Sequence, residues 1–170
     1  LTEDQPYFLV DDELDEVNFG HPTRTRVWDV SNLEAPVLVG YFSSSRPAID
    51  HNLYIRDNFA FQSNYRAGLR VLRLDNLAIP KLTEVAFFDI YPADDEPAFN
   101  GTWNNYPFYA SGTVVISGIE QGLYVLRPNL NYRGFAAQLG SGSVEKGQRV
   151  MVLPSGKTTT IKAIDAYEGE

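Results

Sequence analysis

The sequence has no cysteine, an excess of acidic over basic residues and no long hydrophobic run. The absence of cysteine excludes disulfides, thiolate zinc sites and cysteine nucleophiles. No apolar segment approaches the ~20 residues of a membrane-spanning helix, and no segment has the features of a signal peptide. A net charge of -8 argues against binding to the phosphate backbone of a nucleic acid. Leucine in place of methionine at position 1 predicts a processed or truncated chain.

The 170 residues are rich in aromatics (13%) and contain 13 Gly and 10 Pro, which favours many short strands over long helices. Charge is unevenly distributed along the chain. Residues 1–128 carry 9 basic and 18 acidic side chains, whereas residues 129–170 carry 5 and 4. Aromatic residues are also concentrated before position 128. The sequence therefore predicts two different segments that join near residues 127–130.

The first segment contains an internal repeat. The Arg-Val and Asn-Leu pairs of residues 26–33 recur 44 positions later in residues 70–77, and Pro36 recurs as Pro80. Residues 68–73 (Gly-Leu-Arg-Val-Leu-Arg) have a similar counterpart 54 positions later at residues 122–127. A period of ~40–50 residues with several short strands per unit is typical of β-propeller blades. A four-stranded blade has two apolar faces, so it must stack on its neighbours. A β-sandwich with accidental similarity is the rival interpretation.

These repeats resemble the LVIVD-repeat β-propellers of the choice-of-anchor B type. The resemblance rests on the sequences at residues 26–40, 51–55, 64–72 and 122–128. It implies a secreted or surface-anchored, non-catalytic propeller. About 2.5–3 blades cannot close a ring, for which at least about four are usual. The chain is therefore expected to be a fragment, or its copies associate as a homo-oligomer that completes the ring.

The second segment predicts two strands, at residues 149–153 and 159–164, joined by a turn at residues 154–157. It resembles a translation-factor-like β-barrel, and more closely domain II of the GTPase subunit of sulfate adenylyltransferase (ATP sulfurylase). The resemblance rests on residues 127–130, 132–136, 141–150 and 152–157. This family's catalytic and nucleotide-binding residues lie in a preceding GTPase domain that nothing in residues 1–126 matches. No activity and no cofactor therefore carry over.

Residues 155–158 (Ser-Gly-Lys-Thr) contain the ending of a phosphate-binding loop. The complete motif needs a glycine five positions before Gly156, and Met151 stands there. The β-branched residues that follow disfavour the helix that such a loop requires. We predict a hairpin turn without nucleotide binding.

Five residues in two polar loops are the candidates for binding: Asp50, His51, Asn52, Trp103 and Asn104. His51 suits a ligand or a base oriented by Asp50. Adjacent strand residues point to opposite faces, however, which favours a structural histidine over a dyad. The aromatic stretch around Trp103 suits either a ligand platform or packing between blades.

The acidic run at residues 11–16 lacks the alternating spacing and central glycine of a calcium loop, so it predicts a solvated loop. His21 lies between Gly20 and Pro22 and is expected to be exposed. No second histidine is nearby in the sequence, and we predict no metal site.

We predict an all-β chain in which a partial propeller (residues 1–128) precedes a barrel fragment (residues 129–170). The predicted function is a non-catalytic binding or scaffold fragment of an extracellular or cell-surface propeller, with a protein or small ligand at its loops. It has no catalytic residues, cofactor, nucleic-acid partner or membrane span. The alternative is a cytoplasmic fragment of the sulfate adenylyltransferase GTPase subunit without its nucleotide-binding domain. The overlap of two unrelated patterns at residues 127–130 favours a truncated or composite chain over a natural fusion.

Overall fold

The structure is a computed structural model that describes residues 2, 6–130, 143, 145–152 and 157–161. These residues contain twelve strands and one five-residue helix, which confirms the predicted all-β class. The chain divides into two compact units, Leu1–Tyr132 and Arg133–Glu170, which are described separately below. Within the described part of the chain, no helix has the length and apolar character that crossing a membrane requires.

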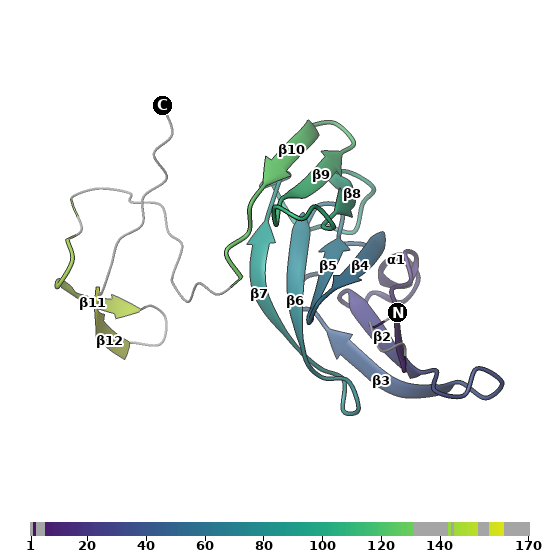
Figure 1. The fold of residues 1–170 in the computed structure, drawn as a ribbon. Coiled ribbons are helices and arrows are strands. Elements are labelled where there is room, and N and C mark those ends of the chain that lie inside the picture. The colour runs from purple at the N-terminus through teal and green to yellow at the C-terminus, as the bar shows by residue number, and fades with distance from the viewer. Residues whose placement is uncertain (1, 3–5, 131–142, 144, 153–156, 162–170) are drawn as a thin grey trace. The chain divides into compact units, whose positions relative to one another are not determined.

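Unit 1 contains three antiparallel sheets whose strands follow one another in chain order (Figure 1). The first sheet consists of β1 (Tyr7–Val10), β2 (Arg24–Asp29) and β3 (Val37–Ser43), with α1 (Asp15–Phe19) between β1 and β2. The second consists of β4 (Asn52–Arg56), β5 (Phe59–Ser63), β6 (Leu69–Asn76) and β7 (Lys81–Phe88). The third consists of β8 (Thr102–Tyr106), β9 (Val114–Gly118) and β10 (Gly122–Leu126).

The sequence repeat is also a repeat of strand pairing. The β2–β3 ladder shifts register between Val27 and Trp28, and the β6–β7 ladder shifts between Val71 and Leu72, which is 44 residues later. A bulge bends and twists the strand that carries it, so the two hairpins share one local shape. The repeat read from the sequence therefore corresponds to a repeated structural unit.

The second offset is preserved as well. Leu69 pairs with Ser63 in the β5–β6 ladder, and Leu123 pairs with Ser117 in the β9–β10 ladder, 54 residues later. The first sheet therefore aligns with strands two to four of the second sheet, and the third sheet aligns with strands one to three. The sheets do not close into a ring among the described residues, and the propeller itself stays a prediction.

Two apolar clusters pack the sheets of unit 1 against each other. One joins the first and second sheets and includes Leu9, Val27 and Leu72, all at most 3% exposed. The other joins the second and third sheets and includes Val71 and Ile116. The inward-facing residues alternate along each strand, as expected where one or both faces are covered. Burying one such side chain contributes roughly 1.5–3 kcal/mol.

Unit 2 contains an antiparallel hairpin of β11 (Arg149–Val152) and β12 (Lys157–Thr160). The predicted pairing is confirmed, although the second strand begins two residues earlier than expected. Lys157 opens this strand, whereas the Gly-Lys-Thr ending of a phosphate-binding loop leads into a helix. Residues 153–156, which hold most of the turn predicted at 154–157, and the predicted strand residues 162–164 lie outside the described part.

Candidate functional site

The structure brings four of the five predicted binding residues into contact, in the pairs His51–Trp103 and Asn52–Asn104. Asp50 and His51 lie just before β4, and Asn52 is its first residue; Trp103 and Asn104 are the second and third residues of β8. Asn52 pairs with Ser63, and Asn104 pairs with Ser117, the counterpart of Ser63 in the next repeat. Residues 50–52 and 102–104 therefore occupy equivalent positions of two neighbouring sheets.

These residues contact each other between the second and third sheets. The ring centroids of His51 and Trp103 are 4.1 Å apart, and Asn52 Nδ2 donates a 3.0 Å hydrogen bond to Asn104 Oδ1. Trp103 is nevertheless 46% exposed. No hydrogen bond joins Asp50 to His51 in the described chain, and both precede the strand, so the alternation of strand faces does not apply to them. The contacts give the cluster a role in joining the sheets.

Tyr65, which the sequence patterns did not single out, is the centre of this cluster. Its ring lies edge-on to His51, with centroids 5.4 Å apart, and its carbonyl accepts a 2.9 Å hydrogen bond from the Thr102 amide. A Cβ on Gly101, whose φ is +85°, would lie 2.6 Å from that same carbonyl oxygen. A glycine before β8 thus permits the close approach that sets Trp103 beside His51. The only sequence signal was the turn at residues 63–68.

The acidic segment approaches this cluster from the first sheet. The Tyr65 hydroxyl donates a hydrogen bond to Glu13 Oε1, and His51 Nε2 lies 4.0 Å from the same carboxylate oxygen. Burial of the phenol, together with the hydrogen bond to Glu13, raises the pKa of Tyr65 well above its usual value. Glu13 therefore links the acidic segment to the polar loops.

The prediction of a solvated loop at residues 11–16 is wrong for its last two members. Asp15 and Glu16 begin α1 and are 1% and 2% exposed. Asp15 Oδ2 accepts a 2.7 Å hydrogen bond from Arg26 Nη2. Gln62 Nε2 donates to Asp11 Oδ2 at 3.1 Å. A run of charged residues favours a solvent-exposed loop. Here Arg26 on β2 and Gln62 on β5 bind two of the carboxylates, which allows part of the run to be buried.

Several buried carboxyl groups of this region have raised pKa values. Burial, together with the neighbouring charges of Asp11 and Glu16, raises the pKa of Asp50 to about 9. Burial raises the pKa of Glu16 to about 8, with a smaller contribution from Asp15. Both carboxylate oxygens of Asp50 and of Glu16 accept no hydrogen bond from the described residues. These carboxyl groups are close enough to influence one another.

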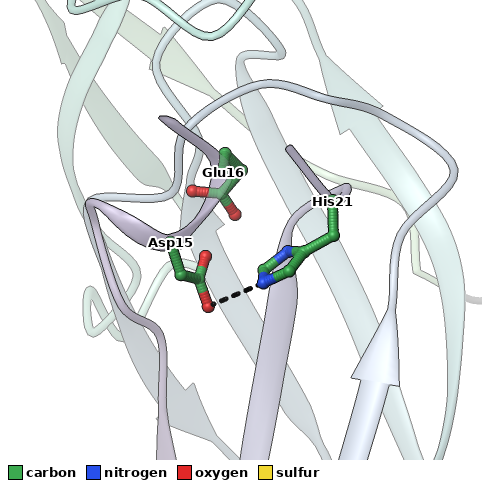
Figure 2. A group of neighbouring side chains, drawn as sticks. All are labelled: Asp15, Glu16 and His21. Atoms are coloured by element: carbon green, nitrogen blue, oxygen red, sulfur yellow. Dashed lines mark ion pairs between the residues drawn. The ribbon is translucent and has the colours of Figure 1, made fainter. Parts of the chain in front are cut away.

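His21 also differs from its predicted state. Its side chain is only 13% exposed, and its Nε2 lies 3.6 Å from Asp15 Oδ2. Asp15, Glu16 and His21 each place one ligand-type atom within 4.8 Å of the others. The sequence argument considered only a second histidine as a further ligand. The other members of this group are carboxylates, Asp15 and Glu16, within six positions of His21 (Figure 2).

Comparison with known proteins shows that part of the chain is similar to sulfate adenylyltransferase subunit 1. The subunit from Bacteroides thetaiotaomicron is 60% identical over 47 residues, which are 28% of this chain and 10% of that protein. The subunit from Bacteroides fragilis is 53% identical over 47 residues, again 28% and 10% of the two chains. The chain thus spans about a tenth of the length of these curated relatives. The similarity supports the predicted resemblance of the barrel-like segment.

The subunit from Pseudoalteromonas atlantica is 34% identical over 110 residues, which cover 56% of this chain and 23% of that protein. This share of the chain exceeds the 42 residues after position 128, so the match extends into unit 1. No family model matches the chain. No solved structure matches it either. The resemblance to LVIVD-repeat propellers stays a prediction.

Proposed function

We propose that residues 127–170 are a piece of the GTPase subunit of sulfate adenylyltransferase, outside the part of that subunit that binds the nucleotide. The observation that carries the proposal is the 60% identity over 47 residues to subunit 1 of that enzyme. In this proposal the chain belongs to sulfate assimilation in the cytoplasm by descent, and it has no active site of its own for GTP.

The chain itself offers a direct test of this proposal. Titration of the full 170-residue chain with a fluorescent GTP analogue is expected to show no saturable binding, because Met151 replaces the glycine of the phosphate-binding motif and β12 replaces its helix. Binding that unlabelled GTP displaces would contradict the proposal. Lys157→Ala is the matched variant, since it would remove such binding only if the Gly-Lys-Thr sequence formed a real phosphate loop.

We further propose that the chain is composite, and the strand alignment supports this. The third sheet has counterparts of β4, β5 and β6. The 54-residue offset would place the counterpart of β7 at residues 135–142, inside the segment that resembles the sulfate adenylyltransferase subunit. The two sequence resemblances therefore meet within one repeat unit. Long-read sequencing of genomic DNA across the codons for residues 127–130 tests this: reads that never span the junction indicate an assembly artefact, and spanning reads indicate a natural fusion.

For unit 1 the second candidate function is a non-catalytic binding or scaffold module of the propeller type, as on a cell surface. The observation that favours it is apolar surface on both end sheets: Val37 and Tyr41 of β3 are 61% and 51% exposed, and Leu123 and Val125 of β10 are 69% and 67% exposed. In a stacked-sheet architecture such faces are covered by a further sheet. Sedimentation at micromolar concentration is expected to show association of copies, and a well-behaved monomer would count against self-assembly.

A further inference from the structure

The residues around α1 form a compact group of potential metal ligands. Gly20 ends the helix with φ +69°, and its amide donates to the Glu16 carbonyl, so the chain reverses and returns His21 toward Asp15. Figure 2 shows the two carboxylates and the imidazole turned toward a common space. Their ligand atoms lie within 4.8 Å of one another. Four ligands at ~2.1 Å from a tetrahedral ion are roughly 3.4 Å apart, so the 3.6 Å from His21 Nε2 to Asp15 Oδ2 already fits.

The orientation of His21 favours an ion. Its Nδ1 lies 2.9 Å from the Pro22 carbonyl oxygen, to which only a protonated Nδ1 can donate. In the neutral ring Nε2 then presents a lone pair toward the Asp15 carboxylate, which is also an acceptor. Two acceptors that face each other need a proton or a cation between them. Metal-bound histidines usually donate their other ring N–H to a carbonyl or carboxylate in this way.

The carboxylates supply a second, independent observation. Glu16 is 2% exposed, and neither of its carboxylate oxygens accepts a hydrogen bond from the described residues; the same holds for Oδ1 of Asp15. Arg26 binds Oδ2 of Asp15 and leaves the other oxygens without a cation. Asp50, also fully buried and without hydrogen bonds, adds a further acidic group nearby. Buried acceptors of this kind normally have a partner.

We propose that Asp15, Glu16 and His21 bind one divalent transition-metal cation, with Zn²⁺ preferred over Mn²⁺, Mg²⁺ or Ca²⁺. Imidazole nitrogen selects against the hard cations, which prefer oxygen alone. Three protein ligands leave at least one position for water. The ion joins α1 to the loop before β2 and supplies a partner for the oxygens of Asp15 and Glu16 that accept no hydrogen bond from the described residues.

The test uses the full chain, prepared free of metal, and titrations with Zn²⁺, Mn²⁺, Ca²⁺ and Mg²⁺. Calorimetry is expected to show one Zn²⁺ per chain, and His21→Gln and Glu16→Gln are each expected to weaken it by at least about tenfold. His51→Gln and Asp12→Asn are the controls: they change the other histidine and an exposed neighbouring carboxylate, and they are expected to leave affinity within about twofold.

A measurement on the unmodified chain keeps the test valid if the variants fold poorly. Zinc is expected to shift the His21 Nε2 NMR signal while the His51 ring signals stay in place. The proposal is overturned if no transition metal binds at millimolar concentration, if His21→Gln binds as tightly as the parent chain, or if Ca²⁺ binds better than Zn²⁺.

Discussion

The interface between the first and second sheets is apolar at one end and acidic at the other, although the same strands form both. The apolar end contains Leu9, Val27 and Ala60 on β1, β2 and β5. Two positions away stand Thr25 on β2, Gln62 on β5 and Asp11 just after the end of β1. Two positions along the chain thus separate a cluster of apolar side chains, which need no hydrogen-bond partner, from a cluster of polar and charged side chains, which do. The first end stabilises the interface through apolar burial. The second end contains the interface's hydrogen bonds and the ion pair between Arg26 and Asp15.

The largest effect is expected at the apolar end. Leu72→Ala removes a side chain that is 1% exposed at the centre of the first cluster, and we expect the free energy of unfolding to fall by about 2–5 kcal/mol. Urea unfolding followed by circular dichroism measures it. A loss below about 1 kcal/mol would show that the first and second sheets are not packed as described.

At the acidic end a substitution is expected to stabilise. Asp50 has a pKa of about 9 in the folded chain, against 3.8 for an ordinary aspartate. Between those pH values the folded chain binds more protons than the unfolded chain, so in the absence of metal its stability falls as pH rises. Asp50→Asn has no charge to bury. We expect it to raise the free energy of unfolding on the order of 2 kcal/mol at pH 9 and hardly at all below pH 4.

Urea unfolding at pH 4, 7 and 9 measures this difference, and metal-chelated buffer keeps cations out of the comparison. Asp57→Asn is the matched control, because Asp57 lies in a turn and its side chain is 72% exposed. Parallel pH profiles for the parent chain and Asp50→Asn would contradict the assignment of Asp50 as a buried carboxyl group among other acids.

A smaller effect is expected where the second and third sheets meet. Asn52 and Asn104 share a hydrogen bond of 3.0 Å, and such a bond contributes about 1 kcal/mol net. A double-mutant cycle with Asn52→Ala and Asn104→Ala is expected to give a coupling energy of that size. Additive losses would mean that the two side chains act independently, and residues 50–52 and 102–104 would then not form one cluster.

The sequence allowed the repeat, the all-β class and the hairpin of unit 2 to be predicted, because turn residues and apolar runs mark them. The strand predicted at residues 149–153, for example, is β11. The sequence also placed both His51 and Trp103 among the candidate binding residues. Their equivalent positions in the repeat, however, became clear only from the strand registers. Local patterns determine strands well because they depend on neighbouring residues.

The buried acids could not be predicted in this way. A run of carboxylates is usually solvated, and what buries Asp15 and Glu16 is a long-range arrangement: Arg26 from β2 and the turn at Gly20. The central position of Tyr65 was not predicted for a related reason. A turn sequence does not indicate that its side chain will be 1% exposed between Glu13 and His51. Whether a polar side chain is buried depends on contacts with residues far away in the sequence, and a local sequence pattern does not reveal those contacts.

The smallest effect on stability is expected from a leucine that differs from Leu72 chiefly in its exposure. Leu123 of β10 is 69% exposed, so Leu123→Ala should change the free energy of unfolding by less than about 0.5 kcal/mol. Leu123→Lys should be equally neutral for folding but should reduce association of copies in sedimentation, because a charge on an apolar face opposes its burial against another sheet. If Leu123→Lys leaves association unchanged, β10 is not the surface through which copies meet. If it unfolds the chain, β10 is covered within the monomer.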